Sequence, residues 1–286
     1  MNIGQRVAAV GMAVSGALAA IKITAGLLGH STAVTADGLE SAADIFASGF
    51  VLLGLTLAAR PADEDHPYGH GRAETLTGLL IGMGLSVGGA LIAVFSLLHL
   101  GAPREALRAF VIWPLVVSLF AKATLASYKF RAGRKLESDA LTADAWNDAM
   151  DGVSASVALI AAGLTLSNPS RFLDADRWGG FIVGIIVILS GARVAWETAQ
   201  QLMDTMPDES RMRQIRAAAA TVPGVRGVEK CFARKTGLRY HVDLHLEVDP
   251  EMTVRQSHDI AHQARLRILE TLDWVADVLV HVEPAP

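Results

Sequence analysis

Cysteine is nearly absent from this sequence, because Cys231 is the only one among 286 residues. A single cysteine excludes a disulfide within the chain. It also excludes the cysteine cages that hold zinc in structural sites. Any metal bound by the chain must therefore take its ligands from His, Asp, Glu or Asn side chains.

Charged residues are also scarce, and they form no large basic block. Only 19% of the residues are charged, and the formal net charge is −4. Without a basic patch the chain has no electrostatic footprint for nucleic acid, so we expect no nucleic-acid partner. In contrast, 51% of the residues are hydrophobic and the mean hydropathy is +0.36, which favours an integral membrane protein in contact with lipid.

Long apolar runs fill most of the chain, and each is about long enough to cross a bilayer as a helix. Six runs are separated by short polar loops: residues 7–29, 33–58, 73–100, 108–130, 139–167 and 178–203. The first run is too long for a cleaved signal peptide, so we interpret it as a transmembrane helix. Lys and Arg are more frequent at the span ends on the side of the two termini. We therefore expect a multi-pass protein of the cell inner (plasma) membrane with both termini in the cytoplasm.

After about Met206 the hydropathy falls and the pattern becomes that of a soluble domain. It predicts a helix, two strands, a helix and a strand over Glu209–Ala220, Val225–Arg234, Leu238–Val248, Val254–Thr271 and Val275–Val282. We therefore predict an α-helical membrane protein with a six-helix transmembrane domain over residues 1–206 and an α+β cytoplasmic domain over residues 207–286. Pairing with a second copy would help so small a core.

Two of the predicted spans carry acidic residues inside their apolar runs. Placing a charged side chain at the bilayer centre costs roughly 2.5–3.5 kcal/mol even on the scale that gives the lowest cost, so these acids are expected to have a function. Glu40 and Asp44 are four residues apart, as are Asn147 and Asp151, so each pair lies on one helical face. If the two faces meet, their oxygens surround a point that suits a divalent cation. The alternative is that these side chains only cross-link helices by hydrogen bonds.

The loop between the second and third spans concentrates acids and histidines. Asp63, Glu64, Asp65, His66 and His70 lie within eight positions. Histidines in a polar loop are often ordinary surface residues, but this clustering indicates a metal site outside the membrane core.

Three stretches of the sequence resemble the cation diffusion facilitator family. Residues 36–44 read ADGLESAAD, residues 63–74 read DEDHPYGHGRAE, and the third stretch runs over residues 138–151. The resemblance covers nearly the whole chain. It implies a homodimer of six-helix protomers with cytoplasmic ferredoxin-like domains. It also implies exchange of a divalent metal for protons by alternating access.

The resemblance further implies three metal sites, of which the last two are expected to hold Zn²⁺ or a similar ion. The transport site falls on Glu40, Asp44, Asn147 and Asp151, the loop site on Asp63, His66 and His70, and the tail site, at the dimer contact, on His245, His258, His281 and Glu283. Other members have a further histidine where this chain has Glu229, which leaves open whether the tail site is binuclear. Asp243, His241 or His262 are alternative contributors.

The expected transport site contains no imidazole, which distinguishes it from the zinc-transporting pattern of the family. That pattern has His or Asp at the position of Glu40 and His at the position of Asn147. Carboxylate and amide oxygens suit harder ions than zinc, so we expect export of Mn²⁺, or of Fe²⁺. Export of Zn²⁺, Cd²⁺ or Co²⁺ by the same mechanism is the alternative, because the general affinity order favours zinc over manganese.

Functions of other classes fit the sequence less well. A passive cation channel would use rings of weak sites, whereas one enclosed site in a protomer suits alternating access. A membrane-anchored metal sensor would not need acids inside its anchor. An intramembrane metal-dependent hydrolase would need a nucleophile or general base near the fifth span, and we find none, so we expect no enzyme activity.

Overall fold

The computed structural model describes residues 3–58, 60–102, 105–135, 139–237 and 239–286. Within the described helices, the side chains of residues 3–12, 44, 46–56, 58, 132–133, 135 and 139–144 fall outside this description.

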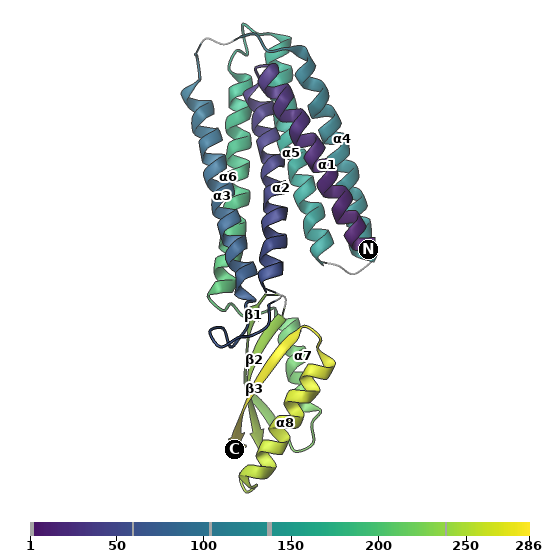
Figure 1. Ribbon diagram of the computed structural model, residues 1–286, viewed down its shortest axis with the longest axis vertical. Coiled ribbons are helices and arrows are strands. Elements are labelled where there is room, and N and C mark those ends of the chain that lie inside the picture. The colour runs from purple at the N-terminus through teal and green to yellow at the C-terminus, as the bar shows by residue number, and fades with distance from the viewer. Residues whose placement is uncertain (1–2, 59, 103–104, 136–138, 238) are drawn as a thin grey trace. The chain divides into compact units, whose positions relative to one another are not determined.

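Six long helices come first, separated by short loops (Figure 1): α1 (Ile3–Leu28), α2 (Thr32–Ala58), α3 (Arg72–Leu98), α4 (Ile112–Lys135), α5 (Asp139–Ser167) and α6 (Ala175–Leu202). A single 3-10 turn, η1 (Ala109–Val111), precedes α4. Helices suit these apolar segments because a helix satisfies its own backbone hydrogen bonds in lipid. Among the described residues, four helical segments are long and apolar enough to cross a membrane: Arg72–Leu98, Ala109–Arg131, Ala145–Ser167 and Ala175–Leu202.

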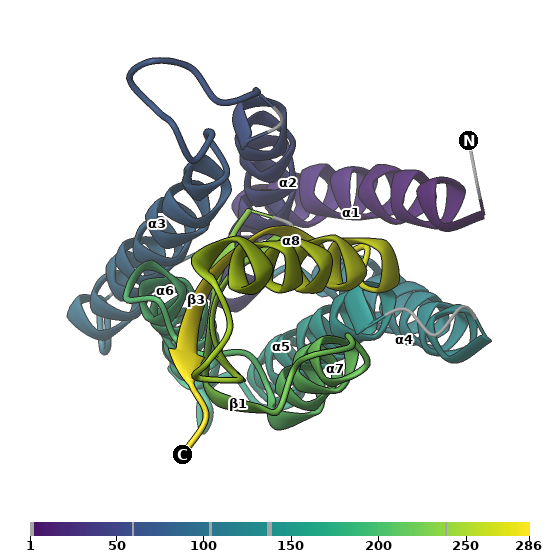
Figure 2. The ribbon, with the colours of Figure 1, turned by 90° about the horizontal axis from the view of Figure 1, so that it is seen from below.

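The chain divides into two compact units. The first contains Met1–Phe50 and Leu80–Ala195, and the second contains Val51–Leu79 and Trp196–Pro286. The first unit therefore holds most of the helical bundle. In it α4 and α5 pack side by side, as Figure 1 and Figure 2 both show.

The N-terminal end of α2 is fixed by hydrogen bonds within the first unit. The Ser31 hydroxyl accepts a hydrogen bond from the backbone N–H of Val34, as a helix cap does. The carboxylate of Asp176 on α6 in turn accepts from the Ser31 hydroxyl at 2.5 Å and from the backbone N–H of Thr32 at 2.7 Å. Asp176 is fully buried, and its negative charge is stabilised by the positive end of α2.

Helices α1 and α2 approach each other closely at Gly38. A Cβ atom on Gly38 would lie 2.7 Å from the backbone nitrogen of Ile23 on α1, so only glycine permits this distance. The close crossing brings Lys22 of α1 beside Asp37 of α2.

The tail folds as a three-stranded sheet with two helices, within the second unit: α7 (Glu209–Ala220), β1 (Gly227–Thr236), β2 (Arg239–Val248), α8 (Val254–Thr271) and β3 (Val275–Pro284). The strands lie in the order β1-β2-β3. The β1/β2 pair is antiparallel and the β2/β3 pair is parallel. The predicted fold class, a helical membrane domain followed by an α+β domain, is confirmed.

The alternating pattern of β2 places one face of the sheet against the two tail helices. Val242, Leu244 and Leu246 are buried, and they belong to the same core as Ile215 of α7 and Ile268 of α8. The residues that alternate with them along β2, including His241 and His245, face away from this core. Strand β1 begins at Gly227 instead of the expected Val225, and β3 ends at Pro284 instead of Val282.

Candidate functional site

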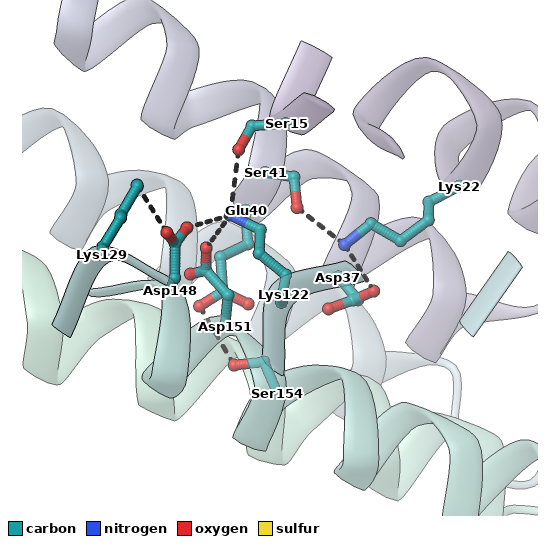
Figure 3. A network of polar contacts seen from close by, with 10 residues as sticks. All are labelled: Ser15, Lys22, Asp37, Glu40, Ser41, Lys122, Lys129, Asp148, Asp151 and Ser154. Atoms are coloured by element: carbon teal, nitrogen blue, oxygen red, sulfur yellow. Dashed lines mark hydrogen bonds and ion pairs between the residues drawn. The ribbon is translucent and has the colours of Figure 1, made fainter. Parts of the chain in front are cut away.

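Ionisable side chains are concentrated in the buried interior of the first unit. Nine described ionisable side chains of this unit are less than a tenth exposed: Asp176 and Arg177 at the start of α6, and Lys22, Asp37, Glu40, Lys122, Lys129, Asp148 and Asp151. In Figure 3 dashed lines link a larger group around Lys122 and a smaller group around Lys22, and they join Glu40 to Ser154. An unpaired charge is costly in such surroundings, so the partner of each buried side chain determines whether that side chain can also bind a metal ion.

Lys122 of α4 lies at the centre of the larger group. Its ammonium forms an ion pair with Asp151 and a second with Asp148, at 2.9 Å, and it donates a hydrogen bond to the hydroxyl of Ser15 at 3.0 Å. Lys129, also on α4, lies 2.5 Å from the other carboxylate oxygen of Asp148. Two lysines from α4 thus face two aspartates from α5.

Glu40 of α2 lies beside this group. The hydroxyl of Ser154 donates a hydrogen bond to Glu40 Oε1 at 3.1 Å, and Ser154 lies one helical turn beyond Asp151 on α5. The structure therefore brings together Glu40 and Asp151, one carboxylate from each of the two helices that the sequence singled out.

The other two expected ligands are placed differently. The side chain of Asp44 lies outside the described residues, and the side chain of Asn147 is exposed in this structure. The buried stripe of α5 consists of Ala145, Asp148, Asp151, Ser154, Ala155 and Ala158. Asn147 lies on the same side of α5 as Asp151, Ser154 and Ala158, which are buried, but it lies one turn nearer the start of the helix, and there its side chain is exposed. Asn147 and Asp151 are therefore not enclosed together in this structure.

Lys122 and Lys129 are the residues of the group that sequence analysis missed. The signal was present, because Lys122 stands in the middle of the apolar run 108–130. A cation inside one span, opposite acids inside another, predicts a buried pair as readily as the acids alone predict a metal site.

Lys22, Asp37 and Ser41 form the smaller group. Lys22 Nζ lies 2.7 Å from Asp37 Oδ2 and donates to the Ser41 hydroxyl at 2.7 Å. Lys22 and Asp37 are each 1% exposed. Asp37 is thus a buried ion-pair partner that joins α1 to α2.

The loop residues Asp63, His66 and His70 form a second candidate site, in the second unit. Their potential ligand atoms all lie within 4.8 Å of one another. His66 Nδ1 is 3.0 Å from Asp63 Oδ1, and His70 Nε2 is 3.5 Å from Asp63 Oδ2. Partial desolvation of Asp63 is outweighed by hydrogen bonds from the backbone and the ring of His66, so the pKa of Asp63 is lowered. An ionised carboxylate with two imidazoles suits a metal such as zinc.

The tail cluster consists of His245, His281 and Glu283, whose potential ligand atoms also lie within 4.8 Å of one another. Register explains the arrangement, because His245 of β2 pairs directly with His281 of the parallel strand β3. Glu283 Oε1 is 2.5 Å from His245 Nδ1 and 3.7 Å from His281 Nε2. Hydrogen bonds with Glu229 and with His245 lower the pKa of Glu283. This donor set also fits a zinc-like ion.

His258, the fourth expected tail ligand, is not part of this cluster. It is an exposed residue of α8, and α8 packs on the face of the sheet opposite to His245. Within one protomer His258 therefore stands apart from the other three.

Comparisons with known proteins cover both parts of the chain. Residues 8–203 match the family described as the cation efflux transmembrane domain, and residues 207–285 match the cation efflux protein, cytoplasmic domain. The chain belongs to the cation diffusion facilitator family. It is therefore a divalent cation efflux transporter, a multi-pass membrane protein with a cytoplasmic C-terminal domain, and not an enzyme. The family of the cytoplasmic domain implies a homodimer.

Several relatives match this cation diffusion facilitator over almost its whole length. The manganese efflux system protein MneP of Bacillus subtilis is 30% identical, over 99% of this chain and 97% of its own. The manganese efflux system protein MneS of the same organism is 32% identical, over 98% and 96%. The cation-efflux pump FieF of Klebsiella pneumoniae is 32% identical, over 98% and 92%.

Among solved structures, the C-terminal domain of MamM is similar to the tail of this cation diffusion facilitator. It is 34% identical, with a TM-score of 0.27, and the match covers 27% of this chain and 98% of that chain.

Proposed function

We propose that this transporter exports Mn²⁺, or Fe²⁺, from the cytoplasm in exchange for protons, by alternating access. The proposed transport site consists of Glu40, Asp44, Asn147 and Asp151. The observation that carries the proposal is the meeting of Glu40 and Asp151, from α2 and α5, in one buried group of charges. Carboxylates are held at that depth at a cost that a divalent cation would offset.

The chemistry of the site supports a hard ion. Among the residues that the structure describes, no histidine belongs to the buried group around Lys122, so this group provides no imidazole ligand for a metal. Oxygen donors suit manganese better than they suit zinc. The names of two relatives, which are described as manganese efflux proteins, agree with this preference. Zn²⁺, Cd²⁺ and Co²⁺ are the alternative cargo, since three carboxylates also hold zinc.

Asp44 and Asn147 enter the proposal through the family resemblance. Asn147 is exposed in the conformation described here, and alternating access includes at least one other conformation. Exchange for protons follows from charge, because carboxylates that a metal leaves behind in a low-dielectric core need another positive partner.

The loop and tail sites are proposed as regulatory sites for Zn²⁺ or a similar ion. The proposed ligands are Asp63, His66 and His70 in the loop and His245, His281 and Glu283 in the tail, while His258 stays a prediction for the dimer contact. Tail metal would stabilise the homodimer and bias the membrane domain towards one state. We also propose that the membrane domain ends at Met206 and that both termini lie in the cytoplasm, at the inner membrane.

The experiment that tests the proposed function is transport by the purified protein in proteoliposomes. Mn²⁺, Fe²⁺, Zn²⁺, Co²⁺ and Cd²⁺ are compared side by side, with and without an imposed pH gradient. The expected result is saturable transport that depends on the gradient and is fastest for Mn²⁺ or Fe²⁺. Transport that ignores the gradient would contradict proton exchange, and flux that does not saturate would favour a channel.

A further inference from the structure

Lys122 binds the same carboxylate that the proposed function assigns to the metal. Its side chain is 1% exposed, and its ammonium pairs with Asp151 and Asp148 and donates to Ser15. An ammonium has three donors, so these three partners satisfy it completely. The pairing is therefore a built arrangement of the protein interior, and no solvent molecule is needed to complete it.

The ammonium and a divalent cation exclude each other at Asp151. Two positive charges about 4 Å apart in a protein interior repel each other strongly, because little solvent screens them. A metal that binds Glu40 and Asp151 must therefore displace Lys122 from Asp151.

Asp148 gives the displaced ammonium a partner. One of its carboxylate oxygens lies 2.9 Å from Lys122, and the other lies 2.5 Å from Lys129. With Ser15 at 3.0 Å, Lys122 keeps two of its three partners when it leaves Asp151. Asp148 thus acts as an anchor for the lysines rather than as a metal ligand.

We propose that Lys122 is a tethered cation that competes with the transported metal for Asp151. It neutralises Asp151 in the metal-free transporter, which leaves Glu40 to the exchanged protons, and it rests on Asp148 and Ser15 while metal is bound. This proposal rests on the proposed function of Glu40 and Asp151, and it makes Lys122 a positioning residue that sets the apparent metal affinity. An exporter benefits from such a competitor, because the metal must leave its site as well as enter it.

The test is the KM and kcat for Mn²⁺ in proteoliposomes, measured on the double variant Lys122→Met/Asp148→Asn. Removing one positive and one negative charge together keeps the net charge of the group. In the wild type, only transporters whose Asp151 is free of Lys122 can bind Mn²⁺, so the apparent affinity for Mn²⁺ is proportional to that fraction. Removing Lys122 should therefore lower KM about tenfold. A merely structural role of Lys122 would lower kcat or protein yield without tightening KM.

The matched control is Lys22→Met/Asp37→Asn. This pair is equally buried, its ammonium lies 2.7 Å from a carboxylate, and it also donates to a serine hydroxyl, but it does not bind Asp151. Its KM should equal that of the wild type. An equal fall of KM in both double variants would overturn the proposal, because the effect would then come from any loss of a buried ion pair.

A conservative variant tests the same idea in the opposite direction. Lys122→Arg keeps the charge and holds a carboxylate with paired hydrogen bonds, so it should be displaced less easily and raise KM. If the double variant does not elute as a monodisperse protein, the arginine variant decides alone. A KM that is unchanged or lower in Lys122→Arg, or unchanged or higher in the folded double variant, would overturn the role of Lys122.

Failure of this proposal can be told apart from failure of the proposed function. If the wild type transports Mn²⁺ and Asp151→Ala does not, but the Lys122 variants leave KM unmoved, only the tethered cation is wrong. If the wild type transports no divalent cation, the proposed function is wrong and the role of Lys122 is overturned with it.

Discussion

Asn147 is the residue whose exchange tests the metal preference most directly. Asn147→His would add an imidazole to a proposed site made of oxygens, and imidazole favours zinc over manganese. The ratio of Zn²⁺ to Mn²⁺ transport should rise about tenfold, which corresponds to 1.4 kcal/mol of added preference. Asn168→His, in the loop before α6, serves as the control and should leave the ratio unchanged. An unchanged ratio in Asn147→His would mean that this position does not set the preference.

The reactivity of the Cys231 thiol tests whether this residue is buried in the folded protein. Burial raises the pKa of the Cys231 thiol to about 11, an effect that nearby Arg216 only partly offsets. The thiolate is the reactive form, so at neutral pH the folded protein should react with a thiol reagent far more slowly than a free cysteine. Labelling should become fast after unfolding in denaturant, and in the folded protein it should accelerate as the pH rises toward 11. Fast labelling of the folded protein at pH 7 would contradict the buried position of Cys231 in β1.

At the scale of single elements, the N-terminal end of α2 depends on Asp176. Asp176→Ala removes a buried acceptor from Ser31 and Thr32, and a hydrogen bond to a charged group contributes roughly 1.5–3 kcal/mol. The variant should therefore show a clearly lower melting temperature in detergent. Glu105→Ala is the control, since the carboxylate of Glu105 also forms an ion pair, with His30, but is 75% exposed. Equal losses in the two variants would contradict the role of Asp176 as the group that fixes α2.

The cluster of His245, His281 and Glu283 on the tail sheet is expected to bind Zn²⁺. Zn²⁺ titrated into the protein should bind more weakly in Glu283→Gln and in His245→Ala, because each change removes one ligand from the three-residue cluster. Glu270→Ala, which removes an exposed acid on α8, provides the control and should leave this binding event unchanged. Isothermal titration calorimetry measures the effect, with the loop site removed by His70→Ala in every variant. Unchanged binding in Glu283→Gln would mean that the tail cluster is only a polar sheet face.

The elements could be predicted from the sequence because their patterns are strong and local. The apolar runs gave six helices, and the alternation in β2 gave its buried face. How deeply each turn of α5 is buried could not be predicted, since it depends on which neighbours cover that turn. As a result the sequence paired Asn147 with Asp151, whereas the structure pairs Asp148 with Asp151 through Lys122. Spacing alone indicates which residues share a face, but not which turns of that face are buried.

At the scale of the whole molecule, we expect the transporter to be a homodimer. The family of the cytoplasmic domain implies one, and the protomer mass is 30.3 kDa. Light scattering after size-exclusion chromatography in detergent should therefore give a protein mass of two protomers. If tail metal stabilises the dimer, chelation should shift the equilibrium toward single protomers on dilution, and Glu283→Gln should show the same shift without chelator. A protein that is monomeric at every concentration would contradict the dimer.

The central claim is that carboxylates from α2 and α5 together carry the metal across the membrane. The most direct measurement is Mn²⁺ uptake into proteoliposomes under a pH gradient, comparing the wild type with Asp151→Ala and with the exposed control Asp259→Ala. The account predicts saturable uptake for the wild type and the control, and none above background for Asp151→Ala, while all three proteins elute alike on size exclusion. Uptake by Asp151→Ala at the rate of the wild type would contradict it.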